Sequence, residues 1–228
     1  MNRVVPILCV IVACELVAAS ALLWWWAVNP PPVPPPEHPR PDLSVLDSVT
    51  AGEIREWQEL VARDTAKDWL NLAEIYVMYG YFAEADLCCR RSIELNPKSR
   101  ESRFLTYYWW GAALYRLGRT EEAAATFRDA IPYAQGQEVS VCWYCIGLNM
   151  LREEKVTEAE SEFRTAEDFF PADYELARIL VRSGRAEEAV PILDHLIVIQ
   201  PKTQKFFQLR ARAAQALGDF EAVADFQE

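Results

Sequence analysis

The feature that most constrains the fold of this chain is a short pattern that recurs along it. Four segments align by eye, namely YGYFAEADLCCRRSIELNP (79–97), LGRTEEAAATFRDAI (117–131), EKVTEAESEFRTAEDFFP (154–171) and SGRAEEAVPILDHLIVIQP (183–201), and LGDFEAVADF (217–226) is a weaker fifth. Each follows an amphipathic stretch of roughly a dozen residues, a length that favours a helix. The pattern therefore predicts units of helix, tight turn and helix. Such units cannot bury their apolar faces alone, so they stack into an all-α solenoid.

The predicted helices carry small residues at matching places. The first helices have Ala73, Gly111, Gly147, Ala177 and Ala211, and the second helices have Ala85, Ala123, Ala159 and Ala189. Two helices approach closely only where small side chains meet, so these residues indicate where the helices of a unit touch. The small residues of the first helices are 38, 36, 30 and 34 positions apart, which predicts links of unequal length between units.

These residues resemble the signature of the tetratricopeptide repeat family, which reads W-x2-L-G-x2-Y in the first helix and A-x3-F-x2-A followed by P in the second. The first unit carries most of it, at Trp69, Leu72, Ala73, Tyr76, Gly80, Ala85, Cys89, Ser92 and Pro97, and the later units carry parts of it. The resemblance implies repeats at 66–99, 104–137, 140–171 and 172–203, and a partial fifth at 204–228. It also implies a protein-binding scaffold rather than an enzyme.

The two flanks of the repeats have their own signals. VTAGEIREWQELVARD predicts a cap helix within 48–65, opened by a capping box of Thr50 and Glu53. At the other end we expect no further solvating helix after the fifth unit. Its apolar residues Phe220, Val223 and Phe226 then either face inward or contact a partner, and homo-oligomerisation through this end is one form of that contact.

The N-terminal part predicts a membrane anchor. Residues 4–28 form an apolar run with one charge, Glu15, and about 20 such residues are enough to cross a bilayer. Arg3 precedes the run and the next basic residue is Arg40, so the positive-inside rule places residues 1–3 in the cytoplasm. We therefore expect a single-pass protein of a bacterial inner membrane, with the repeat domain in the periplasm.

Two alternatives to the uncleaved anchor remain open at this point. Ala19-Ser20-Ala21 is compatible with a signal-peptidase site, and IVAC ending at Cys14 resembles a lipoprotein acylation site. In each case the apolar run continues beyond the candidate site, whereas a cleaved segment normally turns polar. The Pro-rich segment 29–47 follows, and its consecutive prolines favour a semi-rigid polyproline II spacer.

Composition excludes several functional classes. The net charge of −11 argues against binding to nucleic acid, which requires an excess of Lys and Arg. The two histidines, His38 and His195, are far apart, so we expect no metal site, no cofactor and no catalytic residues. Cys142 and Cys145 form a C-x-x-C pair at the start of a first helix. Either they pack in the core, or the protein is a thiol-redox or cytochrome-maturation accessory protein.

The family resemblance also implies a groove lined by the first helices. The expected binding residues are Tyr108, Arg116, Tyr144, Arg152, Tyr174, Arg178, Arg182 and Arg212. Other first-helix residues are also expected to line the groove, namely Leu70, Glu74, Val77, Met78, Ala112, Tyr115, Leu148, Leu151, Val181, Gln208, Gln215 and Ala216. Arg binds carboxylates through paired N–H groups, and Tyr supplies rigid apolar contact. We therefore expect the groove to bind an acidic or C-terminal peptide of a partner protein. The alternative is that these arginines pair with neighbouring Glu or Asp and bind nothing.

Overall fold

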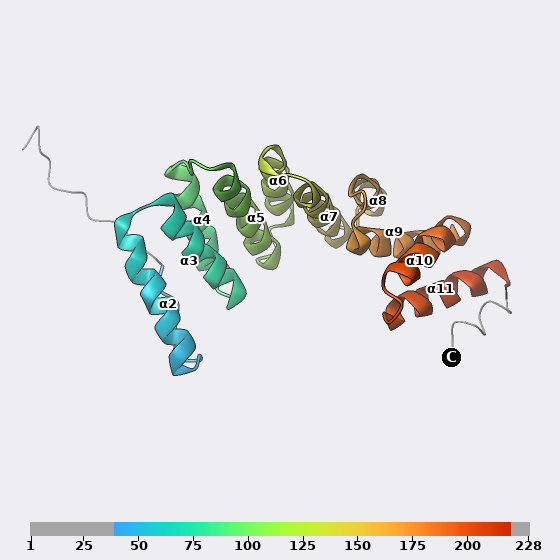
Figure 1. Ribbon diagram of the computed structural model, residues 1–228, viewed down its shortest axis with the longest axis horizontal. Helices are drawn as coiled ribbons and strands as arrows, with labels where there is room; N and C mark the ends of the chain where they lie inside the picture. Colours follow the sequence, from blue (N-terminus) through green and yellow to red (C-terminus); the bar gives the residue numbers. More distant parts are fainter. Residues whose placement is uncertain (1–38, 220–228) are drawn as a thin grey trace, which may run out of the picture. The chain divides into compact units, whose positions relative to one another are not determined.

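The periodic apolar residues of this chain form helices throughout the part that the structure describes. The structure is a computed structural model that describes residues 39–219, so the predicted anchor 4–28, the first part of the spacer and residues 220–228 lie outside it. The elements, shown in Figure 1, are α2 (Ser48–Leu60), η1 (Val61–Arg63), α3 (Ala66–Met78), α4 (Phe82–Glu94), α5 (Arg100–Arg116), α6 (Thr120–Ala130), η2 (Ile131–Tyr133), α7 (Gln137–Arg152), α8 (Val156–Thr165), α9 (Phe170–Arg182), α10 (Ala186–Ile199) and α11 (Gln204–Leu217).

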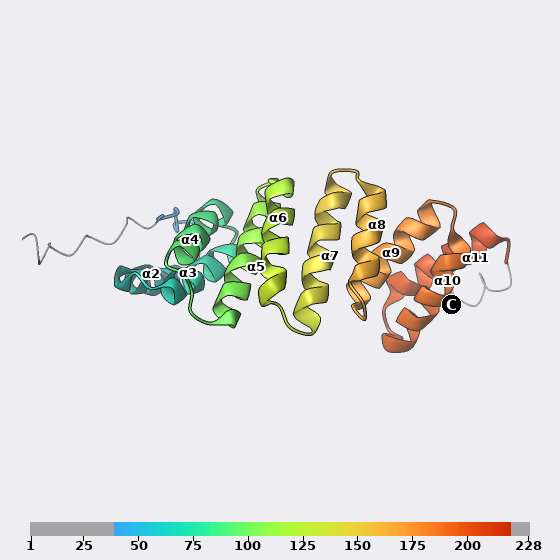
Figure 2. The same ribbon diagram turned by 90° about the horizontal axis from the view of Figure 1, so that it is seen from above.

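The helices form successive pairs, as the sequence pattern predicted. Helices α3 and α4, α5 and α6, α7 and α8, and α9 and α10 are the four pairs, and α11 is the first helix of a fifth unit. Each second helix also packs against the next first helix, and α3 packs against α5 as α9 does against α11. Figure 2 shows the pairs following one another in chain order. The prediction of an all-α repeat solenoid is therefore confirmed for residues 39–219.

The turn inside each pair depends on one residue with positive φ. Gly80, Gly118 and Gly184 occupy this place with φ of 85°, 79° and 78°, where glycine has no side chain to clash. In the third pair Glu154 takes the same place with φ of 60°. The tight turn therefore recurs in all four pairs, although one pair builds it from a residue that adopts this conformation less readily.

The two helices of a pair are held together by complementary side-chain sizes. A Cβ atom added at Gly147 would lie 2.5 Å from the ring of Phe163, and one added at Gly111 would lie 2.9 Å from the ring of Phe127. The aromatic residue comes sixteen positions after the glycine in both pairs. Glycine is therefore required because the ring of the second helix occupies the space next to the first-helix backbone.

The other two pairs use the same spacing with different sizes. Ala73 and Cys89 in the first pair, and Ala177 and Leu193 in the fourth, are also sixteen positions apart, and all four are fully buried. A larger residue on the first helix is thus matched by a smaller one on the second. This explains why Cys89 stands where the family signature has an aromatic residue.

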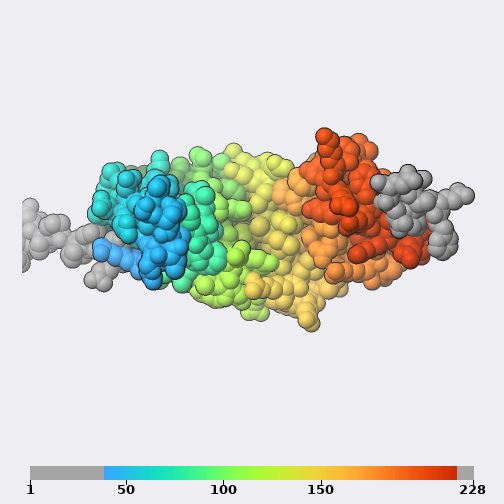
Figure 3. All heavy atoms as spheres, turned by 90° about the horizontal axis from the view of Figure 1, so that it is seen from below, coloured from blue at the N-terminus to red at the C-terminus, as the bar shows by residue number. Residues whose placement is uncertain are grey.

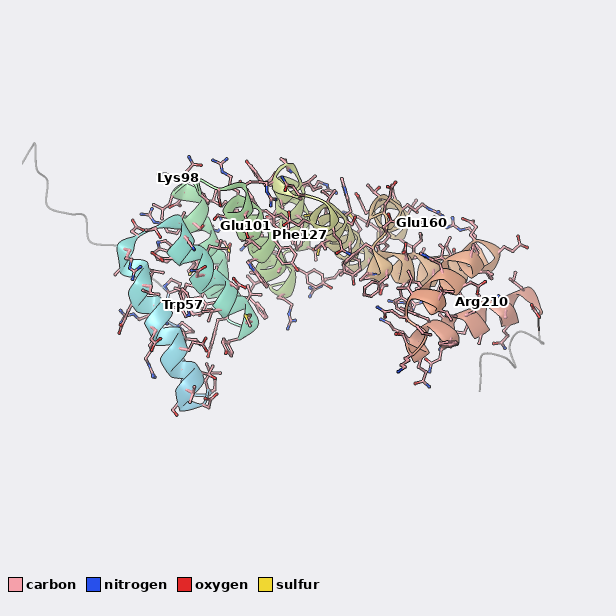
Figure 4. The ribbon with its side chains drawn as sticks, in the orientation of Figure 1. Trp57, Lys98, Glu101, Phe127, Glu160 and Arg210 are labelled. Atoms are coloured by element: carbon pink, nitrogen blue, oxygen red, sulfur yellow. The ribbon has the colours of Figure 1, made fainter. Side chains whose placement is uncertain are left out.

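A second recurring contact joins neighbouring pairs. Arg119, just before α6, donates to Asp86 Oδ2 on α4 at 2.6 Å. Arg185, just before α10, donates to Glu160 on α8 at 2.5 Å, and Glu160 is labelled in Figure 4. Asp86 and Glu160 directly follow the buried alanine of their own second helix. Arg119 and Arg185 lie four positions before the matching alanine of the next second helix. These ion pairs join the first pair to the second and the third pair to the fourth.

The cap helix begins differently from its sequence prediction. The predicted capping box of Thr50 and Glu53 is wrong, because Asp47 is the N-cap residue. Asp47 Oδ1 accepts hydrogen bonds from the backbone N–H groups of Val49 and Thr50, both at 3.0 Å. The Thr50 hydroxyl donates to Asp47 Oδ2 at 2.6 Å instead of capping the helix itself.

The described end of the Pro-rich spacer is attached to the first repeat. The Tyr76 hydroxyl donates to the carbonyl of Pro39 at 2.7 Å, and the Tyr81 hydroxyl donates to the carbonyl of Asp42 at 2.9 Å. Leu43 and Leu46 pack against the core of α2, α3 and α4. Residues 39–46 are therefore part of the folded domain, and only the segment before them has the composition of a free spacer.

We predict that Gly147→Ala destabilises the protein by about 1–3 kcal/mol, because the new methyl group overlaps the ring of Phe163. The double variant Gly147→Ala with Phe163→Leu should recover part of the loss, since it recreates the Ala177 and Leu193 pair. Urea denaturation midpoints measure both effects.

The matched control for this prediction is Gly52→Ala on α2, where no atom lies within 4 Å of an added Cβ. There the higher helix propensity of alanine should stabilise the protein by up to about 1 kcal/mol. If Gly147→Ala is as stabilising as Gly52→Ala, the contact with Phe163 does not constrain the pair.

We also predict that Asp86 contributes a pH-dependent part of the stability. Burial by itself would raise the pKa of Asp86, but hydrogen bonds from Arg90, Trp110 and Arg119 outweigh it and lower this pKa below its usual value. A lowered folded-state pKa means that the contribution is present above about pH 4 and is lost as the pH falls through the folded-state pKa.

Asp86→Asn should therefore lower the unfolding free energy by about 1–3 kcal/mol at pH 7 and by less at acidic pH. Denaturation between pH 7 and pH 3 tests this difference. Asp129→Asn, which changes an exposed carboxylate on α6, is the control and should leave the pH profile unchanged. An equal loss at pH 3 and pH 7 contradicts the ion-pair role of Asp86.

Candidate peptide-binding surface

Three arginines end three successive first helices. Arg116, Arg152 and Arg182 are the last residues of α5, α7 and α9, and all three are exposed. They lie five residues after Gly111, Gly147 and Ala177, so they hold the same place in their units. We call Arg116, Arg152 and Arg182 the arginine row. Figure 3 shows one side of the stacked units, which follow one another in chain order.

Two arginines of the row rest on aromatic rings of the preceding unit. The Arg116 guanidinium carbon lies 4.7 Å from the centre of the Phe82 ring, and that of Arg152 lies 5.0 Å from the Tyr115 ring. Arg152 also donates a hydrogen bond to the carbonyl of Tyr115. Stacking of this kind orients a guanidinium group and leaves N–H groups at its edge for other acceptors.

The arginine row differs in its ion pairs from Arg178, another arginine of the groove prediction. Within residues 39–219, no carboxylate forms an ion pair with Arg116, Arg152 or Arg182. Arg178, in contrast, pairs with Glu175 at 2.5 Å. Arg212 is exposed on α11 and also has no ion pair within the described residues. The alternative that the groove arginines are paired internally therefore holds for Arg178 and not for the row.

A pocket of about 290 Å³ lies beside Arg116, and we call it the α5 pocket. It is lined by Val77, Phe82, Tyr108, Ala112, Tyr115, Arg116, Phe127, Cys145, Leu148 and Asn149. These residues come from the first, second and third units, with α5 contributing the largest share. Figure 4 labels Phe127, which forms part of the wall from α6. Apart from Arg116, the lining carries no charge.

Sequence reasoning named part of this lining and missed the rest. Val77, Ala112, Tyr115 and Leu148 were expected in the groove, as were Tyr108 and Arg116. Phe82, Phe127, Cys145 and Asn149 were not expected there. Phe82 begins α4 and Phe127 lies in α6, so both belong to second helices. Whether they form part of the wall depends on how neighbouring units stack. A pattern counted along first helices alone does not contain that information.

The predicted tyrosines occupy two kinds of position. Tyr108 lines the α5 pocket and stacks on Phe104, with the ring centres 5.9 Å apart. Tyr144 is half-buried and packs against Phe163 of its own unit at 5.9 Å and against Phe169, which precedes the next unit, at 5.4 Å.

Tyr174 packs on Phe206 with the ring centres 5.4 Å apart. The ammonium nitrogen of Lys205 lies 4.6 Å from the centre of the Tyr174 ring. Like Tyr144, it joins one unit to the next. The structure therefore brings Tyr108 and Arg116 together at the α5 pocket, and neither Tyr144 nor Tyr174 lines it.

The C-x-x-C pair lies in a packed environment. Cys142 is fully buried, and Cys145 forms part of the wall of the α5 pocket. Burial raises the pKa of both thiols to about 12, whereas a redox-active cysteine needs a lowered pKa. The surroundings of the two thiols therefore give no support to redox activity.

Residues 39–219 contain no group of three or more His, Cys, Asp or Glu side chains placed to hold a metal ion. In the same part of the chain, no helix has both the length and the apolar character that crossing a bilayer requires.

Helical pairs stacked around a continuous core define this chain as a helical-repeat protein. Family models for the tetratricopeptide repeat match residues 69–99, 106–129 and 171–195. The chain therefore contains tetratricopeptide repeats, as its sequence signature predicted. No curated protein sequence matches it significantly.

Several solved structures share the fold at low sequence identity. Pseudomonas aeruginosa pilF is 18% identical, with a TM-score of 0.64 over 78% of this chain and 83% of that one. PilW, a widely conserved type IV pilus biogenesis factor, is 20% identical, with a TM-score of 0.58 over 78% and 87% of the two chains. YrrB, a tetratricopeptide repeat protein with an unusual peptide-binding site, is 16% identical, with a TM-score of 0.59 over 76% and 89%.

We predict that Cys142 and Cys145 react slowly with a thiol reagent in the native protein at pH 8, because their raised pKa keeps both thiols protonated. Unfolding should expose them to rapid reaction. The measurement uses a background in which Cys9 and Cys14 are replaced by Ser, with Ser161→Cys on α8 as an exposed control that reacts at once. Rapid labelling of Cys142 or Cys145 at neutral pH in the folded protein would contradict this prediction and support a thiol-redox role for the pair.

Proposed function

We propose that this protein is an interaction scaffold that binds an acidic peptide segment of a partner along its first helices. The observation that carries the proposal is the arginine row, Arg116, Arg152 and Arg182. A scaffold of this kind holds a partner in place, as an adaptor or assembly factor does. Tetratricopeptide repeats support binding to proteins in general, and the choice of an acidic peptide rests on the arginines alone.

The arrangement of the row suits a peptide that lies across several units. Each arginine belongs to a different first helix, so one extended segment with acidic residues at intervals can contact all three. Guanidinium groups bind carboxylates through two parallel N–H donors. No carboxylate within the described residues pairs with these three arginines, so their N–H donors are available to a ligand, apart from the one that Arg152 donates to the carbonyl of Tyr115.

A structural role for the row is the main competing explanation. An arginine at the C-terminal end of a helix also interacts favourably with the helix dipole, and this alone stabilises a helix by about 0.3–1 kcal/mol. Binding and stability must therefore be measured on the same variants, because the dipole effect changes only stability.

We further propose that the repeats are presented on the outer side of a bacterial membrane and tethered by residues 4–28. The N-terminal sequence supports this location through its apolar run and the absence of basic residues between Arg3 and Arg40. The fold shared with PilW, a type IV pilus biogenesis factor, makes a role in assembling an envelope structure a suitable first hypothesis.

The test compares two pairs of substitutions that change the charge equally. Arg116→Gln with Arg182→Gln removes two members of the row that make no hydrogen bond to other described residues. Arg55→Gln with Arg63→Gln removes two exposed arginines of the cap region and serves as the control. Binding of a labelled peptide of alternating Asp and Glu to the full-length protein is followed by fluorescence anisotropy, beside its Asn and Gln counterpart.

We expect the acidic peptide to bind and its amide counterpart to bind far more weakly. The row variant should lose about tenfold in affinity, corresponding to about 1.4 kcal/mol, and the control variant should lose little. Added salt should weaken binding to the wild-type protein more than to the row variant. Equal losses in the two variants, with unchanged unfolding midpoints, would show that the row is not the binding site.

A further inference from the structure

We propose that the α5 pocket binds one aromatic side chain of the peptide, next to a peptide carboxylate held by Arg116. This inference rests on the proposed function and adds the residue type that the ligand must carry. The ligand class is therefore a peptide in which an aromatic residue and a carboxylate are neighbours. The carboxylate is supplied either by an Asp or Glu side chain or by the end of a partner chain.

The pocket exists because one position of α5 is small. Ala112 directly follows Gly111, and the matching residues of the other units are Glu74, Leu148, Arg178 and Arg212. Those longer side chains extend from the other first helices, whereas the methyl group of Ala112 leaves space. The pocket is therefore a feature of the second unit rather than a general property of the repeat.

The walls of the pocket are suited to an aromatic guest. Phe82, Tyr108, Tyr115 and Phe127 bring four rings to the lining, and Val77 and Leu148 add aliphatic surface. Rings favour edge-to-face and offset contacts with other rings, and these contacts stabilise a complex beyond the area that they bury. The volume of about 290 Å³ is at the lower limit for small-molecule sites. It therefore matches one large side chain better than a complete small ligand.

Arg116 sets which residue must accompany the aromatic one. It lines the pocket, is exposed, and stacks on Phe82, which is itself part of the wall. A carboxylate that bonds to Arg116 is therefore adjacent to the guest ring. Arg152, stacked on the wall residue Tyr115, provides a second guanidinium group from the third unit. The charges around the pocket are positive, and this favours an aromatic residue inside an acidic segment over one in a neutral segment.

The experiment uses the full-length protein and four acidic probe peptides, of which the first two differ at one position. Both consist of alternating Asp and Glu, with Trp at the centre of one and Ala at the centre of the other. A third probe ends in Trp with a free carboxylate, and a fourth is the same peptide with a C-terminal amide. The third and fourth probes distinguish a chain end from an acidic side chain as the source of the carboxylate.

We expect the Trp peptide to bind at least about tenfold more tightly than the Ala peptide, because the ring is buried in the pocket. Ala112→Leu places in α5 the residue that α7 has at Leu148, and it should remove this difference without weakening the Ala peptide. Ala125→Leu, at an exposed position of α6, is the matched control and should keep the difference. Unfolding midpoints of both variants verify that they fold.

The outcomes separate this inference from the proposed function. If the Trp and Ala peptides bind equally and both depend on the arginine row, the scaffold function stands and the pocket inference is overturned. If the Trp preference survives Ala112→Leu, the ring binds elsewhere and the inference is also overturned. If no acidic peptide binds, both proposals fail together.

Discussion

The contact on which the rest of the structure depends is the approach of the two helices within each pair. In the second and third pairs, an aromatic ring lies against a glycine so closely that no Cβ atom fits between them. In the first and fourth pairs, alanine is matched with the smaller Cys89 and Leu193. Because interiors are packed as densely as organic crystals, the sizes of the two residues must change together. The four pairs therefore make this contact with three different combinations of residues.

This packing also determines which side chains are left for binding. The second helix fills the inside of each pair, with a ring in the second and third pairs and with Cys89 and Leu193 in the other two, so the opposite side of each first helix is left for other contacts. The arginine row lies at the end of that side, held in part by rings of the preceding unit. Arg119 and Arg185 bind acidic groups of the preceding unit and thereby join neighbouring pairs. Structural arginines and candidate binding arginines thus differ in whether a carboxylate of a neighbouring helix is within reach.

Residues that look equivalent in the sequence separate once their neighbours are known. Arg178 and Arg182 lie one turn apart on α9, yet the first is paired with Glu175 and the second has no ion pair within the described residues. Tyr108 and Tyr144 precede the glycines of their units by the same three positions, but of the two only Tyr108 lines the α5 pocket. Tyr144 packs instead against Phe163 and against Phe169, which lies in the link after α8. The sequence pattern could predict the helix positions of these residues, but not which of them a neighbouring unit covers.

The sequence by itself determined the repeat, the helix pairs, the tight turns and the family resemblance, because each of these depends on residues close together in the chain. Its local patterns were less decisive at the cap helix, where Asp47 rather than Thr50 supplies the N-cap. Only the tertiary structure decided the attachment of residues 39–46 to Tyr76 and Tyr81, the ion pairs between units, the burial of the C-x-x-C thiols and the α5 pocket. These features arise from contacts between residues up to 39 positions apart. They depend on how the units stack, and no periodicity along a single helix specifies that.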